Sequence, residues 1–584
     1  MSETVLVSMQ LEDVRLVLDR AGCGQVPKAL IEESEAILLE AERIGKPALA
    51  AQAAASLARV LTSDGQVEAA LAAISRGRQV MQNCDAQSAA VELDLREAEA
   101  YQRCALLDPS TAAMPDGAWQ RALACCRRAL TIVEIERVGA DAPYLQAGFM
   151  RGRTRLYEIG ARAMLGLGHK AGAIQLLDSA KARGLPPRDH LSTHIPEALL
   201  AFRMAVGTER MRAWRALMRR LTAPKPFSGA AIAAAQAGLA KDQAALWWGW
   251  LDETTLLVAA FDRDRWDAAA YPVSDRLCRT MRSIARGIIQ GTGSSAAMTA
   301  MEQRSLAKLL LPSWAEAIVL GRRRIVLSPH RVLHGLPLQI TPTREGPLGL
   351  VRAVSFIPSL ASLVTPIPVA SSGLAAAYAT RFREGLHNLP EAAEMAEAAL
   401  AEEEARRGPT IRINADKPAR GCLLKLSDAG KLREIREIWF CCHGQNLLEQ
   451  SPLESQLELG TEYLDGLDLA TLDLSADIVV LLACHAGKRA VKALGMSNLP
   501  ADDLLGLQGA LRVAGARQVL APQWPVEPRL LMAVLPRMHA RRGEPRDLAL
   551  QTALAEFVEG GGSLDQLPQR WAPLQLVVFG QAKP

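Results

Sequence analysis

Two short apolar segments of this chain end in side chains that can do nucleophilic chemistry. Segment 435–442 is followed by His443 and Gly444, and segment 477–483 is followed by Cys484. Both are rich in β-branched or aromatic residues and too short for a typical helix, so each is predicted to be a buried strand. If both strands lie in one parallel sheet, an imidazole and a thiol meet at its carboxyl edge, where open α/β folds place their sites. This arrangement predicts attack by a cysteine thiolate, assisted by a histidine.

The elements that must position these two residues lie in the second half of the chain, where strand-like and helical segments alternate. Strands are predicted over 324–327, 353–356, 437–441, 478–482, 518–521 and 574–579, and a β-hairpin over 244–250 and 255–261. Such alternation predicts a mainly parallel sheet covered by helices. His443 and Cys484 are 41 positions apart (484 − 443), which suits one crossover between neighbouring strands.

The first part of the chain, up to about residue 225, is rich in Ala, Leu, Glu and Arg with helical periodicity. Helices are predicted over 28–44, 48–61, 67–81 and 86–107. Gly65, Gly117 and Gly168 each precede small or apolar residues at offsets of 5, 9 and 12, which predicts a repeated helix-turn-helix unit. The spacings of 52 and 51 residues (117 − 65 and 168 − 117) exceed the ~34 of a tetratricopeptide repeat. An irregular helical bundle is therefore the alternative.

Composition limits the class of protein. At 584 residues the chain is predicted to form more than one domain. A net charge of +4, with basic and acidic residues interspersed, gives no footprint for nucleic acid. No segment reaches the ~18 apolar residues of a membrane span, and residues 1–4 lack the basic start of a signal peptide. Ten cysteines without framework spacing favour a reduced, cytoplasmic protein.

Further segments stand around the His443 and Cys484 segments in an order that resembles the CHAT family of caspase-like peptidases. They are 325–329, 333–338, 356–360, 389–394, 464–469, 506–516 and 519–526. The resemblance covers roughly residues 240–584, and in this family the CHAT domain commonly follows tetratricopeptide repeats. It implies an N-terminal α-helical, tetratricopeptide-like regulatory domain over 1–225. A caspase-like α/β peptidase domain with a mainly parallel central sheet would follow over 226–584.

The same resemblance implies roles for individual residues and a clan that includes caspases, metacaspases and separases. Cys484 matches the nucleophile, and His443 matches its general base and acid. The backbone N–H groups of Gly444 and Cys484 would stabilise the oxyanion. No cofactor is expected. The implied function is an endopeptidase for a specific protein substrate, regulated by a protein partner through the helical repeats, in a bacterial defence or cell-death pathway. The alternative is a catalytically silent scaffold that acts by binding proteins.

Five further residues are candidates for contacting substrate. They are His485, Asp502, Asp503, Gln523 and Trp524. The two aspartates lie in a polar loop after Cys484, and their alternative role is to cap the following helix. Trp524 follows the strand at 518–521 and either walls a subsite or belongs to the core. His485 either lines the cleft or is merely exposed.

Two other kinds of site are disfavoured. Cys441 and Cys442 are expected to be core residues, because cysteine is among the most often buried residue types. Together with His443, Cys484 and His485 they offer enough ligands for zinc, but adjacent strand residues point to opposite faces and no Cys-x-x-Cys pair occurs. There is also no G-x-S-x-G, Walker A or G-x-G-x-x-G motif, so serine hydrolysis and nucleotide binding have no local support.

Overall fold

The computed structural model describes most of the chain. The described residues are 3–21, 26–82, 84, 86–112, 117–139, 153–181, 195–206, 209, 212, 213, 216, 230–289, 299–301, 303–382, 388–445, 455–483, 486, 506–561 and 567–583. They fall into two compact units, one made of the described residues up to Gly139 with 153–177, the other of those from Asp178 onward. This division differs from the expected domains 1–225 and 226–584, which stay a prediction. None of the described helices is long and apolar enough to cross a membrane.

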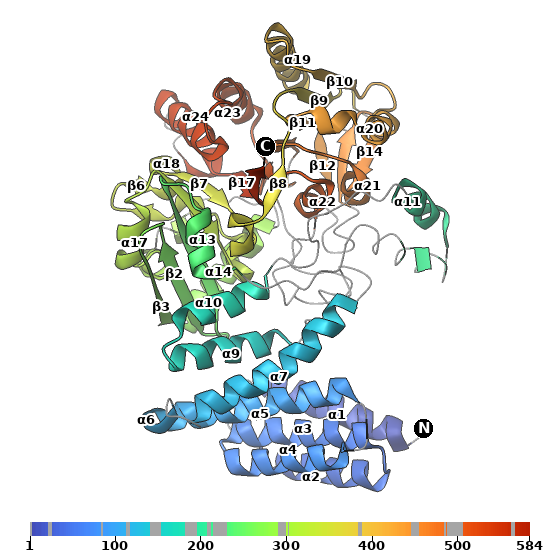
Figure 1. Cartoon of the computed structure of the whole chain (residues 1–584), viewed down its shortest axis with the longest axis vertical. Helices are drawn as coiled ribbons and strands as arrows, with labels where there is room; N and C mark the ends of the chain where they lie inside the picture. The colour runs from blue at the N-terminus through green and yellow to red at the C-terminus, as the bar shows by residue number, and fades with distance from the viewer. Residues whose placement is uncertain are drawn as a thin grey trace. The chain divides into compact units, whose positions relative to one another are not determined.

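The first unit is helical (Figure 1). Its helices are α1 (Glu3–Ala21), α2 (Lys28–Arg43), α3 (Pro47–Asp64), α4 (Val67–Val80), α5 (Gln87–Leu107), α6 (Pro109–Ala112), α7 (Ala118–Gly139), α9 (Thr154–Gly166) and α10 (Lys170–Ser179), the last of which ends in the second unit. The four helices predicted between 28 and 107 are confirmed, with ends within three residues. Gly65 and Gly168 follow α3 and α9 in the left-handed region, with φ of 87° and 81°. Glycine adopts this conformation without steric cost and so ends these helices.

Close approach between the helices explains one repeated small residue. A Cβ atom added at Gly77 of α4 would lie 2.8 Å from the Ala54 Cβ of α3 and 3.0 Å from a methyl carbon of Leu93 in α5. The absence of a side chain at this position therefore lets three helices pack together. The assignment of this unit as a tetratricopeptide-like array stays a prediction.

An eleven-stranded sheet forms the centre of the second unit. In spatial order its strands are β10 (Thr410–Asn414), β9 (Leu374–Tyr378), β11 (Glu437–Cys441), β15 (Ile478–Leu482), β16 (Gln518–Pro522), β17 (Leu574–Val578), β7 (Ala353–Phe356), β4 (Arg324–Ser328), β1 (Gln243–Trp250), β2 (Thr255–Phe261) and β3 (Trp266–Pro272). All six predicted strands and the predicted hairpin are confirmed, with ends within one residue. The expected fold class, a helical part followed by an α/β part with a mainly parallel sheet, is also confirmed.

The sheet consists of two parallel blocks that run in opposite directions. Strands β10, β9, β11, β15 and β16 are mutually parallel, as are β17, β7, β4 and β1. The blocks meet at the antiparallel pair β16–β17, and β2 and β3 add an antiparallel edge. The carboxyl ends of β9, β11, β15 and β16 therefore share one edge of the sheet, where a site would be expected.

Helices and smaller sheets complete this unit. The helices are α11 (Ile195–Met204), α13 (Ile232–Gly238), α14 (Asp275–Ile289), α16 (Arg304–Leu310), α17 (Ser313–Val319), α18 (Leu348–Val351), α19 (Pro390–Ala405), α20 (Ala419–Asp428), α21 (Gly466–Thr471), α22 (Leu507–Ala514), α23 (Pro528–Ala540), α24 (Arg546–Gly560) and α25 (Pro568–Trp571). The smaller sheets are β12 (His443–Gln445) with β13 (Gln456–Leu459) and β14 (Glu462–Asp465), β8 (Pro366–Pro368) with β18 (Gln581–Lys583), and β5 (Pro342–Thr343) with β6 (Gly346–Pro347). Helices α23 and α24 lie side by side (Figure 1).

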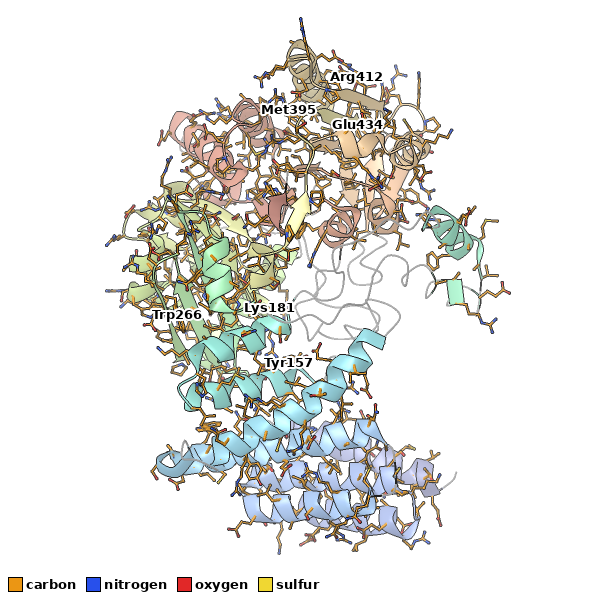
Figure 2. The ribbon with its side chains drawn as sticks, in the orientation of Figure 1. Tyr157, Lys181, Trp266, Met395, Arg412 and Glu434 are labelled. Carbon is orange, nitrogen blue, oxygen red and sulfur yellow. The ribbon has the colours of Figure 1, made fainter. Side chains whose placement is uncertain are left out.

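A fully buried lysine just after α10 is bound inside the second unit. The Nζ atom of Lys181, labelled in Figure 2, donates to the carbonyl oxygens of Trp248 (2.9 Å) and Pro329 (3.2 Å) and lies 4.4 Å from the Trp247 ring centre. Nearby, the buried carboxylate of Asp178 accepts from Trp247 Nε1 at 3.0 Å. A buried ammonium group is tolerated only with such partners, so residues 178–181 are an integral part of this unit.

Candidate active site

The candidate site begins with two adjacent strands in a known register. Strands β11 and β15 are parallel neighbours, and Cys441 is paired with Leu482. The pairing extends one residue further, because the N–H of Cys442 donates to the carbonyl oxygen of Leu482 at 3.5 Å. Both strands are buried along their whole length, which explains their composition of β-branched and large apolar residues. The prediction that one connection joins neighbouring strands is confirmed.

His443 starts β12 where the chain leaves β11, and its side chain is half-buried. Its imidazole meets the ring of Phe382 edge to face, with the ring centroids 4.7 Å apart and an interplanar angle of 72°. The next residue, Gly444, is also half-buried and is paired with Leu457 of β13. An edge-to-face contact of this kind contributes about 0.5–1.5 kcal/mol. It also restricts the orientation of the imidazole, which a general base requires.

Phe382 was not among the residues predicted from the sequence. It lies in the segment after β9, the strand on the other side of β11. The Phe382 N–H donates to Asn388 Oδ1 at 3.1 Å, and the N–H groups of Thr380 and Arg381 both donate to Asp416 Oδ1 at 3.1 Å. Burial raises the pKa of Asp416, but the bonds from Thr380 and Arg381 outweigh it and lower that pKa. The segment that carries Phe382 is thus fixed by an ionised carboxylate and an amide.

The amino ends of β11 and β15 are held by buried charges at the opposite edge of the sheet. Glu437 accepts from Trp439 Nε1 at 2.7 Å and from Arg546 Nη2 at 3.0 Å, and Arg546 Nε also lies 3.5 Å from Asp477 Oδ2. Burial raises the pKa of Glu437, but Arg546 and the nearby His539 hold it well below its ordinary value. These contacts fix the two strands relative to each other, and so support the register at their carboxyl ends.

Several predicted site residues lie outside the described residues. They are Cys484, His485, Asp502 and Asp503. The residues just before Cys484, Leu482 and Ala483, are described and buried. The catalytic and substrate-binding assignments of the four residues stay predictions.

Gln523 and Trp524 lie just after β16, and both are buried. Gln523 Nε2 donates to the carbonyl oxygen of His334 at 3.4 Å, and its backbone N–H donates to the carbonyl oxygen of Pro573 at 2.9 Å. The Trp524 side chain is 2% exposed, and its Nε1 donates to the carbonyl oxygen of Gln569 at 3.2 Å. In this structure Trp524 is a core residue, and a subsite role for it or for Gln523 stays a prediction.

The other cysteines near the site are unsuited to nucleophilic attack. Cys441 and Cys442 are 1% and 2% exposed, which confirms their expected place in the core. Burial raises the pKa of the Cys441 thiol to about 12, so at neutral pH it is not a thiolate. Neither residue competes with Cys484 as a candidate nucleophile.

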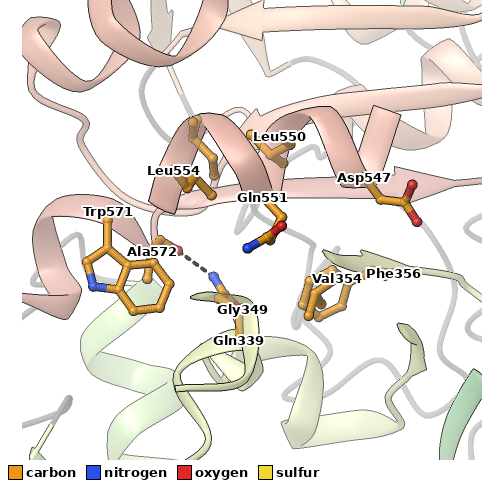
Figure 3. Close-up of a pocket in the computed structure, with 11 residues that line it drawn as sticks. Gln339, Gly349, Val354, Phe356, Asp547, Leu550, Gln551, Leu554, Trp571 and Ala572 are labelled. Carbon is orange, nitrogen blue, oxygen red and sulfur yellow. Dashed lines mark hydrogen bonds between the residues drawn. The ribbon is translucent and has the colours of Figure 1, made fainter. Parts of the chain in front are cut away.

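A cavity in the other block of the sheet is lined mainly by apolar side chains (Figure 3). Gln339 projects into it and donates from Nε2 to the carbonyl oxygen of Ala572, whereas its Oε1 has no hydrogen-bond partner in the described part of the chain. None of the lining residues belongs to β11, β12, β15 or the Phe382 segment. Because the lining contains none of the candidate site residues, this cavity is not part of the candidate active site.

Phe382 gives a testable prediction about the site. We expect Phe382→Ala to slow any reaction assisted by His443 by about 10- to 100-fold. Without the Phe382 ring the imidazole would be less well oriented, and a poorly placed catalytic group lowers the reaction rate. The rate of alkylation of Cys484 by a peptide-based thiol reagent, measured against pH, is the appropriate readout. Phe382→Tyr keeps the ring edge and serves as the control. Equal alkylation rates for Phe382→Ala and the unmodified chain would show that the contact has no positioning role.

The chain is similar to known proteins in sequence and in fold. A family model described as CHAT domain matches residues 302–581, and no curated protein matches the chain. Among solved structures, the chain is similar to two separase chains from Saccharomyces cerevisiae separase–securin complexes, with 10% identity and TM-scores of 0.42 and 0.40. The alignments cover 94% and 95% of this chain and 49% and 50% of the separase chains. The chain therefore spans about half the length of those separases.

Proposed function

We propose that the chain, in which residues 302–581 match the CHAT-domain family model, is a cysteine endopeptidase that cleaves a protein substrate with His443 and Cys484. The register of β11 and β15 carries the proposal. His443 is the second residue after Cys441, Cys484 is the second residue after Leu482, and Cys441 and Leu482 are paired. Two residues span at most about 7.6 Å between Cα atoms, and this short separation from the paired residues supports the proposal that His443 and Cys484 act together.

The proposed reaction proceeds through an acyl-enzyme. The Cys484 thiolate adds to the carbonyl carbon of the scissile peptide, and the C–N bond breaks as His443 gives a proton to the leaving amine. Water, deprotonated by His443, then hydrolyses the thioester and restores the thiol. The N–H groups of Gly444 and Cys484 are proposed to stabilise the oxyanion. His485, Asp502 and Asp503 remain candidates for contacting the substrate.

We extend the proposal to regulation and context on the strength of the family resemblance. The helical unit is proposed to bind a regulatory protein, since arrays of paired helices present extended surfaces. A cytoplasmic role in a bacterial defence or cell-death pathway completes the proposal. The activity and the regulation are separable, because the candidate dyad lies in the second unit.

A peptide-library assay tests the peptidase activity. The purified chain is incubated with a mixed-sequence peptide library, and the products are identified by mass spectrometry. We expect cleavage after a restricted set of residues that is lost after alkylation with iodoacetamide and unchanged by EDTA. If neither cleavage nor labelling by peptidyl thiol probes is observed, the scaffold alternative is favoured instead.

A further inference from the structure

The outward face of helix α14 is formed mainly by arginine side chains. Four exposed arginines, which we call the arginine stripe, follow one another along this helix: Arg276, Arg279, Arg282 and Arg286. At about 100° per residue they fall within an arc of roughly 120° around the helix axis. The opposite face contains Met281, Ile284 and Ile288, which are 0%, 2% and 2% exposed and belong to the core of the second unit. The helix is therefore packed against the core on one face and directs the arginine stripe to solvent on the other.

Neighbouring carboxylates neutralise only a small part of the stripe. Arg282 Nη2 lies 3.3 Å from Glu253 Oε2, but the two side chains are 59% and 79% exposed, so this ion pair is weak. Within the described part of the chain, the other three arginines of the stripe form no ion pair. By contrast, Arg412 of the same unit is paired with two glutamates of α19. The stripe therefore keeps most of its positive charge available for a partner.

The arginine stripe lowers the stability of the helix that carries it. Successive arginines are separated by three, three and four residues, and at these spacings side chains are neighbours on the helix surface and like charges repel. Arg276 also lies in the first turn, where the helix dipole disfavours a positive charge. Asp275 suits that end of the helix, but it is the only acidic residue in the sequence of α14. A surface that reduces helix stability in this way needs a separate explanation.

We propose that the arginine stripe binds an acidic helix of a partner protein. Successive arginines rise about 4.5, 4.5 and 6 Å along α14, and carboxylates placed three or four residues apart on another helix rise by the same steps. Each facing pair can then form two parallel hydrogen bonds between guanidinium and carboxylate. Side chains on one face of an extended strand repeat at about 6.6 Å or more, which fits the stripe less well. The stripe belongs to the second unit, so this surface differs from the one proposed above on the helical unit.

A nucleic acid fits the stripe less well than an acidic helix. The net charge of the chain is only +4, whereas domains that bind nucleic acid are usually strongly basic. Glu253 and Asp275 also place carboxylates beside the arginines, and these would repel a continuous row of phosphates. An acidic helix can instead place each carboxylate only where an arginine faces it.

Fluorescence anisotropy with the full chain and labelled peptides tests the proposal. The probe is an alanine-rich helical peptide that carries four glutamates at the spacing of the stripe. Its control is a peptide of the same composition whose glutamates are spread around the helix. We expect saturable binding of the probe that weakens when NaCl is raised from about 50 mM to about 300 mM, because salt screens exposed charges. The control peptide is expected to bind at least about tenfold more weakly.

Charge reversal within the stripe should remove this binding. We expect Arg279→Glu with Arg286→Glu to weaken binding of the probe at least about tenfold. The thermal unfolding midpoint should not fall, because the substitutions relieve repulsion along α14. Lys417→Glu with Lys425→Glu makes the same change in net charge at two other exposed positions of the second unit. This matched control should bind the probe like the unmodified chain.

Four results would overturn the proposal. The first is an absence of binding to the probe even at low salt. The second is binding that the stripe variant retains, or that the matched control loses equally. The third is equal binding of the two peptides, which would exclude recognition of one helix face. The fourth is tighter binding of a single-stranded oligothymidylate of similar charge, which would make the stripe a nucleic-acid surface. Circular dichroism checks the fold of each variant, and none of these measurements depends on peptidase activity.

Discussion

Cys484→Ala is expected to abolish peptide cleavage and leave the thermal unfolding midpoint nearly unchanged. Loss of the only atom that bonds to the substrate should lower kcat by at least about 10⁴-fold, as removal of a nucleophile does in other hydrolases.

His443→Ala should lower kcat by about 10²–10⁴-fold, the range for a general acid–base group. It should also move the pH profile for alkylation of Cys484 toward the ordinary thiol pKa of about 8.5. Peptide cleavage and labelling by a peptidyl thiol probe measure both effects.

Cys422→Ala is the matched control for this experiment, because Cys422 is an exposed free cysteine on α20. Its removal should leave cleavage and probe labelling unchanged. Full activity in Cys484→Ala would contradict the assignment of the nucleophile. Full labelling of Cys484 after His443→Ala, with an unchanged pH profile, would contradict the pairing of the two residues.

Glu437→Leu is expected to lower the free energy of unfolding by about 3–5 kcal/mol, the largest loss of stability among the substitutions considered. The substitution leaves the buried guanidinium of Arg546 without its closest carboxylate and Trp439 Nε1 without an acceptor. Urea denaturation followed by tryptophan fluorescence measures the change. Glu434→Gln is the control, since Glu434, labelled in Figure 2, is 58% exposed and is paired with Lys431, which is 56% exposed. The control should change stability by less than about 1 kcal/mol.

The loss in Glu437→Leu should also depend on pH. The pKa of Glu437 is lower in the folded chain than in the unfolded chain, so its ionised form stabilises the fold above the unfolded pKa of about 4.3. This contribution decreases as the pH falls below that value toward the folded pKa. The stability difference between Glu437→Leu and the unmodified chain is therefore expected to be constant near neutral pH and to shrink in acid. A difference that stays constant into acid would contradict a role for the carboxylate charge.

The strands that could be predicted from the sequence are those with continuous runs of apolar residues. Strand β15, with Ile478 to Leu482, and the hairpin β1–β2 are continuous apolar runs, so composition alone identified them. Strand β9 was missed because it reads Leu374-Ala375-Ala376-Ala377-Tyr378, a run with low strand propensity. It becomes a strand because β10 and β11 flank it in the sheet. Long-range pairing of this kind leaves no local pattern to recognise.

The candidate site was predictable only in part for the same reason. His443 and Cys484 could be proposed from the sequence because each closely follows a recognisable strand, and their catalytic roles stay predictions. Phe382 could not, because its contact with His443 depends on β9 lying beside β11 and on Asn388 and Asp416 holding the intervening segment. Nor did Lys181 stand out, since a buried lysine is recognised by its carbonyl partners, and these are contributed by Trp248 and Pro329, far along the chain.

The buried Lys181 has a practical consequence for producing the second unit alone. A fragment that starts at residue 226 contains all eleven strands of the large sheet but lacks both Lys181 and Asp178. The carbonyl oxygens of Trp248 and Pro329 and the Trp247 indole would then lose their partners inside an apolar interior. Fragments made for expression should therefore start before residue 178. A poor yield of the shorter fragment would reflect the loss of these contacts, and would not show whether the helical unit controls catalysis.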